Sequence, residues 1–108
     1  MNYYEHTFIT KQDLTEGQNK KVLEKYESII EKNSGKVLKT EEWGLRNLSY
    51  EIKNNRKGFY FHIKFEGMGK TIEELERAEN IDEMLLRYLT VKVKKHDLET
   101  IYFEKKEF

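Results

Sequence analysis

The sequence lacks cysteine, which excludes disulfide bonds and thiolate metal sites as sources of stability. It also lacks an excess of charge of either sign, because 20 basic residues balance 20 acidic ones. A net charge of zero argues against a protein that holds nucleic acid by overall attraction alone. No apolar run approaches the roughly 20 residues that span a bilayer, and no export signal follows Met1. We therefore expect a cytoplasmic protein without a membrane partner.

The length favours a single folded unit. A chain of 108 residues is typical of one domain. A domain of this size buries roughly two thirds of its unfolded surface, which is enough for a stable core without disulfide bonds or a structural metal. From Lys95 onward the sequence is charged and shows no periodic pattern. We expect a domain over residues 1–95 and a charged tail over residues 96–108.

Hydrophobic periodicity predicts six secondary-structure elements. Thr15 has the capping-box spacing to a glutamine, and Gly35 is expected to end the same helix in a left-handed conformation. Thr71 is expected to cap a second helix, with Glu73 and Glu74 in its first turn. The predicted elements are strands at 2–10, 36–53, 59–66 and 84–94, a helix between Thr15 and Gly35, and a helix from Thr71.

Gly44 interrupts the longest predicted strand. Up to Trp43 the alternation places Lys39 and Glu41 on the face of the tryptophan, and beyond Gly44 a new alternation begins. An extra residue in a strand bends it and re-aims its side chains, and glycine tolerates the positive φ that one class of bulge requires. We predict one long strand, bent at Gly44, that ends in a polar, basic turn over residues 53–58.

The order of the elements predicts the fold class. Strand, helix, strand, strand, helix, strand corresponds to two split βαβ units. Such a chain forms an α+β, ferredoxin-like domain, in which a four-stranded antiparallel sheet carries both helices on one face. The other face of the sheet is then free. In the strand at 59–66, Tyr60, His62 and Lys64 form an outward row on this free face, where they either stack on bases or are simply solvated.

The sequence contains no recognisable catalytic constellation. His6, His62 and His96 lie on different predicted elements, so we interpret them as sheet-surface or tail residues rather than metal ligands. The acidic residues between 73 and 83 are typical of a solvated helix face. No nucleophile elbow and no phosphate-binding loop is present. We predict a protein that is not an enzyme and that uses no metal, cofactor or small-molecule substrate.

Two further groups of residues are candidates for binding. The last strand and the residue after it carry Arg87, Lys92, Lys94 and Lys95 without an acid among them, which suits phosphate contacts or, alternatively, only solubility. Trp43 beside the predicted bulge suits contact with a partner, although a core or edge-covering role is the alternative.

Several of these residues form a pattern that resembles a known family. The segments are Tyr4-Glu5, then Glu42-Trp43-Gly44 with Arg46, Leu48 and Tyr50, then Gly58-Phe59-Tyr60, and finally Arg87 followed by Lys92. In this order and spacing they resemble the bacterial small-subunit ribosomal protein S6 family over nearly the whole chain. The resemblance implies the ferredoxin-like fold and a structural, non-catalytic role in the ribosome.

The resemblance also implies partners and sites. A member of this family binds the central domain of small-subunit ribosomal RNA as a heterodimer with ribosomal protein S18. The resemblance implies that the residues in contact with RNA, or in structural support of such contacts, are Tyr4, Arg46, Tyr50, Arg87, Lys92 and Lys94. It implies partner contacts at Trp43 and Gly44. This chain departs from the family pattern at Asn2 and Tyr3, where a basic residue is common, which puts an N-terminal phosphate contact in doubt.

Two other functions remain open on the same fold. One is a ligand-sensing or oligomerising module that associates through its open sheet face or an edge strand and binds no nucleic acid. The other is a small acyl-phosphate hydrolase, which would need a phosphate-cradling loop with a fixed arginine. The sequence shows no such loop.

Overall fold

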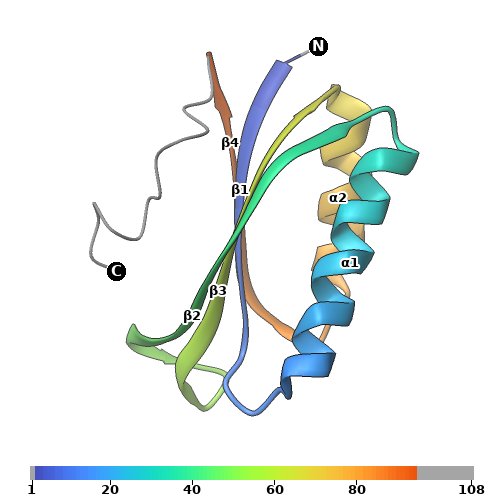
Figure 1. The fold of residues 1–108 in the computed structure, drawn as a ribbon. Coiled ribbons are helices and arrows are strands. Elements are labelled where there is room, and N and C mark those ends of the chain that lie inside the picture. The colour runs from blue at the N-terminus through green and yellow to red at the C-terminus, as the bar shows by residue number, and fades with distance from the viewer. Residues whose placement is uncertain (1, 95–108) are drawn as a thin grey trace.

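A computed structural model describes residues 2–94, and in it the chain forms one antiparallel sheet covered by two helices. Its elements are β1 (Asn2–Lys11), α1 (Glu16–Lys32), β2 (Lys36–Ile52), β3 (Asn55–Gly67), α2 (Gly69–Asn80) and β4 (Leu85–Val93). The strand order is β2-β3-β1-β4, and both helices lie on one face (Figure 1). This arrangement confirms the predicted ferredoxin-like fold. The predicted tail over 96–108 lies outside the described residues.

The core fills the space between the helices and the sheet. Phe8 of β1 lies at its centre, where its ring stacks on Phe61 at 5.0 Å and meets the edge of Tyr26 of α1 at 5.3 Å. Ile63 and Phe65 of β3 are fully buried beside them. Alternation along β1 and β3 sends these side chains toward the helices. Neither described helix has the length and apolar composition needed to cross a membrane.

The helix boundaries follow the predicted caps only in part. The capping box at Thr15 is present, but the left-handed residue after α1 is Ser34 (φ 65°) rather than Gly35. At Gly35 a Cβ would lie 2.7 Å from the Ile30 carbonyl oxygen, so glycine is required there for space. The prediction that Thr71 caps α2 was wrong, because the helix begins at Gly69 and its first turn carries no acidic residue.

The predicted turn between β2 and β3 was too long. The two strands are joined at Lys53 and Asn54, which have φ values of 48° and 65°. Two consecutive residues with positive φ match the twist of a tight hairpin, so pairing continues to Ile52 and Asn55. The basic residues Arg56 and Lys57 therefore belong to β3 rather than to a loop.

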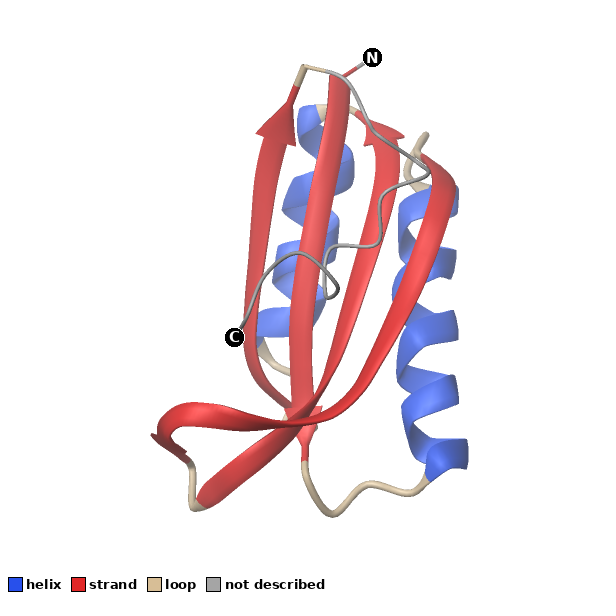
Figure 2. Cartoon of the chain, turned by 60° about the vertical axis from the view of Figure 1, so that its left-hand side comes forward, coloured by secondary structure: helices blue, strands red, loops and turns tan. Residues whose placement is uncertain are grey.

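The bulge at Gly44 is present as predicted. The register of β2 against β3 shifts between Glu42 and Gly44, and Gly44 has a φ of +80°. Beyond the bulge the β2–β3 hairpin twists away from the rest of the sheet (Figures 1 and 2). Because of this twist, Tyr50 of β2 reaches Arg87 of β4, although the two strands lie at opposite edges of the sheet.

Two polar residues that we interpreted as surface groups are in the core. His6 was expected on the sheet surface, yet it points toward the helices and is fully buried. Glu79 was expected on a solvated helix face, yet it is 2% exposed and its carboxylate oxygen lies 2.5 Å from His6 Nε2. The two positions share the periodicity of their apolar neighbours Phe8 and Leu75, which was the signal for their burial.

Candidate nucleic-acid interface

A group of basic and aromatic side chains gathers where the hairpin meets β4. This basic-aromatic cluster consists of Trp43, Arg46, Tyr50, Tyr60 and Arg87. The guanidinium of Arg87 lies over the ring of Tyr50, 5.4 Å from its centroid. This geometry is a cation–π contact, which orders a flexible cation at a modest cost in entropy. The bend at Gly44 and the twist of the hairpin bring the two strands together here.

The inner part of the cluster is held by stacking and by one backbone contact. The indole of Trp43 stacks on Tyr60 with 6.3 Å between centroids. Arg46 donates from Nε to the carbonyl oxygen of Trp43 at 3.2 Å. Burial raises the pKa of the Tyr60 hydroxyl, while the charges of Arg46 and Arg87 oppose that rise. Tyr60 therefore keeps its proton, and the cluster retains two positive charges beside a neutral ring.

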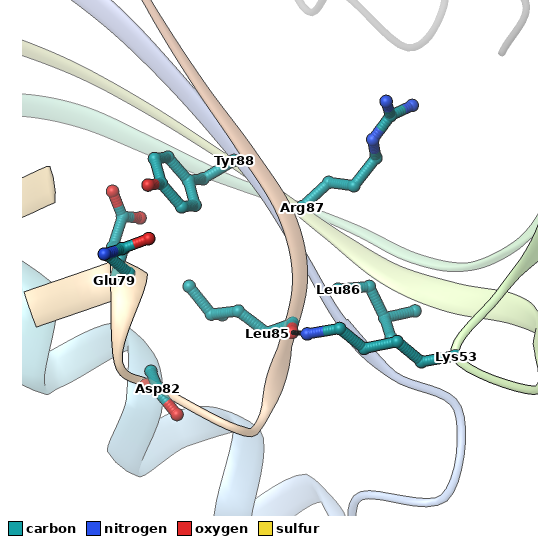
Figure 3. Close-up of a pocket in the computed structure, with 8 residues that line it drawn as sticks. Lys53, Glu79, Asp82, Leu85, Leu86, Arg87 and Tyr88 are labelled. Carbon is teal, nitrogen blue, oxygen red and sulfur yellow. Dashed lines mark hydrogen bonds between the residues drawn. The ribbon is translucent and has the colours of Figure 1, made fainter.

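The outer part of the cluster is open to solvent. Tyr50 is 57% exposed, and Arg87 is also exposed. In Figure 3 the Arg87 side chain extends away from Glu79 and Asp82. An exposed aromatic ring beside a guanidinium suits RNA, because the ring offers a face for a base and the cation offers hydrogen bonds to phosphate.

Lys92 and Lys94 form a separate basic site at the far end of β4. Lys92 pairs with Tyr4 and so lies on the helix-facing side of the sheet, whereas Arg87 pairs with Ile9 and lies on the other side. Five positions separate them along the strand, which corresponds to about 17 Å. Lys92 and Lys94 line a hollow of about 460 Å³ with Asn2 and Tyr3. The structure thus divides the predicted basic strand between two sites.

Tyr4 belongs to the core. It is 9% exposed, and its ring stacks on Phe65 at 5.5 Å. Since the pair of Tyr4 with Lys92 joins β1 to β4, this residue supports the strand that carries the second basic site.

The outward row of β3 is more enclosed than predicted. Tyr60, His62 and Lys64 do lie on the face away from the helices, but each is less than 9% exposed. Neither expected alternative fits, because buried side chains are neither solvated nor open for stacking on bases. The ring of Trp43 stacks on the ring of His62, with 5.3 Å between the ring centroids and 12° between the ring planes. His62 Nδ1 is within 2.8 Å of Thr7 Oγ1. β3 is a central strand with large neighbours on both sides, and alternation alone does not reveal this.

Trp43 and Gly44 contribute in different ways to this face. The indole of Trp43 is 6% exposed, and its Nε1 donates to Glu41 Oε1 at 3.1 Å. Gly44 is exposed, and a Cβ at this position would meet no atom within 4 Å. The backbone at the bulge is therefore accessible to solvent beside the basic-aromatic cluster.

Lys53 is a basic neighbour of the cluster that the candidate residues did not include. Its ammonium donates to the carbonyl oxygen of Leu85 at 3.4 Å. Lys53 and Arg87 border a pocket of about 280 Å³ whose lining also includes Glu79, Asp82 and Tyr88 (Figure 3). The basic character of the turn was visible in the sequence, but its reach to β4 depends on the twist of the hairpin.

The described part of the chain contains no cluster of metal ligands. Within residues 2–94, histidine and acidic side chains do not gather in a group of three that is suited to a metal ion. Two histidine–carboxylate pairs lie within these residues. His6 with Glu79 is fully buried in the core, and His62 with Glu5, 3.3 Å apart, is largely buried on the other face of the sheet.

Comparison with known proteins identifies the family. The family model described as ribosomal protein S6 matches residues 3–92. The small ribosomal subunit protein bS6 of Pelagibacter ubique is 56% identical over 107 residues, covering 99% of this chain and 88% of that protein. The bS6 of Bartonella bacilliformis is 43% identical over 99 residues, covering 92% and 73%.

A solved structure agrees with these relatives. The crystal structure of 30S ribosomal protein S6 from Thermotoga maritima superposes with a TM-score of 0.82 at 31% identity, covering 85% of this chain and 87% of that one. The fold and these relatives therefore define a class of protein: structural components of the small ribosomal subunit, which act in translation and are not enzymes. The chain belongs to the ribosomal protein S6 family, whose members work in the cytoplasm as part of the ribosome.

Proposed function

We propose that this protein binds the central domain of small-subunit ribosomal RNA, and that it does so as a heterodimer with ribosomal protein S18. The observation that carries the proposal is the basic-aromatic cluster, in which the guanidinium of Arg87 lies 5.4 Å from the ring centroid of the exposed Tyr50. The chain that carries this cluster belongs to the ribosomal protein S6 family and has a net charge of zero. A protein without overall positive charge needs a local site and a partner to hold RNA.

In this proposal the cluster makes the first RNA contact. Arg87 and Arg46 supply charge-assisted hydrogen bonds to phosphate, and Tyr50 supplies a stacking face. Lys92 and Lys94 make a second, separate phosphate contact, and Tyr4 supports the strand between them. A contact site on each side of β4 suits an RNA that wraps around the edge of the sheet.

S18 in turn contacts the face and edge near Trp43 and Gly44. The buried indole of Trp43 stiffens this face by stacking on Tyr60 and His62, and the bulge at Gly44 leaves accessible backbone beside it for S18.

A salt titration of RNA binding tests the proposal. Affinity for a central-domain RNA fragment is measured with this protein alone, with S18 alone and with both together. We expect weak binding for each protein and tight binding for the mixture. The absence of any gain on mixing two folded proteins would contradict the heterodimer and favour the oligomerising module, for which sedimentation would show self-association.

Substitutions of basic residues test which of them contact phosphate. Arg87→Gln in the mixture is expected to weaken binding and to reduce the log–log salt slope by about 0.9 for a lost phosphate contact. Lys92→Gln combined with Lys94→Gln is expected to reduce the slope independently. Arg77→Gln is the matched control, because Arg77 is an exposed arginine on α2 that pairs with Glu73 and Glu74. An equal loss for Arg77→Gln would count against the cluster.

A further inference from the structure

Three elements of the fold meet at a polar contact inside the core. His6 comes from β1, Glu79 from α2 and Thr90 from β4. His6 Nε2 lies 2.5 Å from Glu79 Oε2, and His6 Nδ1 lies 2.6 Å from Thr90 Oγ1. The side chains of His6 and Glu79 are both 0% exposed. The imidazole is therefore a bridge between α2 and the edge strand β4.

The surroundings of this bridge are poor in compensating charge. The rings of Phe8 and Tyr88 lie 5.9 and 6.5 Å from the imidazole. The second carboxylate oxygen of Glu79, Oε1, is buried without a hydrogen-bond partner. Any net charge at this contact is consequently expensive, because water does not reach it.

The titratable groups that face the contact make an additional negative charge unfavourable. Glu76 of α2 and Asp82, which follows the end of α2, lie nearby, and the phenol of Tyr26 faces the contact from α1. Lys25 of α1 is 3.5 Å from Asp82 and is engaged there, half exposed. From the sheet, β4 contributes Tyr88, whose ring lies 6.5 Å from the imidazole. Burial raises the pKa of the Glu79 carboxyl, and the His6 contact opposes that rise.

Proton counting shows which state fits this site. With one titratable proton on the pair, the contact is neutral overall, either as imidazolium and carboxylate or as imidazole and carboxylic acid. Loss of that proton leaves a buried carboxylate, and gain of a second leaves a buried imidazolium. In both neutral states Nδ1 carries a hydrogen, which it donates to Thr90 Oγ1.

We propose that His6 and Glu79 share one titratable proton, and that this proton locks β4 onto α2 through Thr90. The lock opens on both sides of a pH optimum, because either departure places an unbalanced charge in the core. Thr90 lies between Arg87 and Lys92, so the lock acts on the strand that carries both basic sites. It is a property of the fold of the free protein, and it does not depend on RNA or on S18.

The pH dependence of unfolding tests the lock. The unfolding equilibrium constant is measured by urea titration between about pH 3 and pH 9 for the natural chain and for a His6→Leu, Glu79→Leu double variant, because an unfolded glutamate takes up its proton only below about pH 4.3. An apolar pair of similar volume replaces a buried ion pair without leaving an orphan charge. We expect the ratio of the two constants to pass through an optimum, with a change approaching about tenfold per pH unit on each side for one proton. Parallel curves would overturn the proposal.

A matched control and a direct measurement complete the test. Glu73→Gln removes an exposed carboxylate from the same helix, where the Glu73 side chain is 71% exposed, and is expected to leave the optimum unchanged. If the double variant does not fold, NMR of the natural chain still decides. The His6 ring nitrogens and the Glu79 carboxyl carbon are expected to report two coupled protonation steps. A neutral ring beside an ionised Glu79 over the whole folded range would refute the shared proton.

Discussion

Arg87 and Tyr50 show how a single contact gives a surface residue a defined geometry. A free arginine side chain has many rotamers, and holding it in one of them costs entropy. The ring of Tyr50 offsets part of that cost before RNA arrives, because it attracts the guanidinium at 5.4 Å. The ring therefore acts on RNA binding partly through its neighbour.

Substitution of Tyr50 tests whether the ring or the hydroxyl acts in RNA binding. Tyr50→Leu removes both the cation–π contact, worth about 0.5–1 kcal/mol, and the stacking face, and is expected to weaken RNA binding by the heterodimer by at least about two- to fivefold. Tyr50→Phe keeps the ring and is expected to bind almost as the natural chain does. Filter binding at fixed salt measures both. An equal loss in both variants would indicate that the hydroxyl, and not the ring, carries the effect.

His62 makes the stability of the domain sensitive to acid. Burial lowers its pKa from the ordinary 6.5, and Glu5 and Glu41 oppose this shift. The unfolded chain therefore takes up a proton at a higher pH than the folded chain does. The contribution of His62 to the free energy of unfolding is therefore complete above about pH 6.5, and it is lost as the pH falls from there through the lower pKa of His62 in the folded chain.

A glutamine at position 62 tests this dependence. His62→Gln is expected to lose less stability than the natural chain between about pH 7 and pH 5, whatever its stability at neutral pH. Urea unfolding of both proteins at the two pH values measures the difference. If the variant loses as much as the natural chain, His62 does not titrate in this range.

At the scale of elements, Thr71 joins the two helices. Its hydroxyl accepts from the Met68 N–H at 3.1 Å and donates to the Asn33 carbonyl oxygen at 2.6 Å. The first contact closes the start of α2, and the second ties it to the end of α1. The side chain is fully buried, so neither partner finds water easily if the hydroxyl is removed.

Loss of that hydroxyl is expected to be costly. Thr71→Val keeps the shape but leaves two polar groups unpaired, and it is expected to lower the free energy of unfolding by about 1–3 kcal/mol. Thr71→Ser keeps the hydroxyl and loses one methyl group, so its loss is expected to be smaller, about 1 kcal/mol. Urea denaturation provides both values. A larger loss for serine than for valine would show that packing dominates at this position.

The elements differ in how far the sequence predicts them. Alternation in β1 and β3 and the capping box at Thr15 are local signals, and the structure confirms these elements. The cap at Thr71 was misplaced because a buried threonine in the first turn has the same sequence signature as a cap. His6 and Glu79 occupy core positions of their periodic patterns, but a polar side chain there is identified as buried only when its partner, 73 positions away, is known.

At the scale of the molecule, the binding residues are assembled by twist. β2 and β4 are opposite edges of the sheet, and no pairing rule places Tyr50 beside Arg87. The sequence indicates the bend at Gly44 but not the angle through which the hairpin turns. For this reason the fold was predicted from periodicity, whereas the composition of the basic-aromatic cluster required the structure.

The distribution of burial predicts how the molecule opens. β3 is buried on both faces from Tyr60 to Phe65, whereas β2 beyond Gly44 is largely exposed. Amides of central β3 are expected to exchange hydrogen only on global unfolding, and those of residues 47–52 by local opening at a rate at least about tenfold higher. Hydrogen exchange followed by NMR resolves the two groups. Equal protection across both would contradict a locally mobile hairpin tip.

The crossing of the hairpin to β4 also has a consequence for the protein before it reaches a ribosome. An edge strand offers unpaired backbone groups on which another chain adds a strand, and this is a common start of aggregation. Here Lys53 occupies the Leu85 carbonyl, Tyr50 covers the Arg87 side chain, and charged Lys92 follows along the same strand. The start of β4 is thereby capped by the chain's own hairpin, and copies made in excess of ribosomal RNA are expected to resist edge-to-edge association while they wait for assembly.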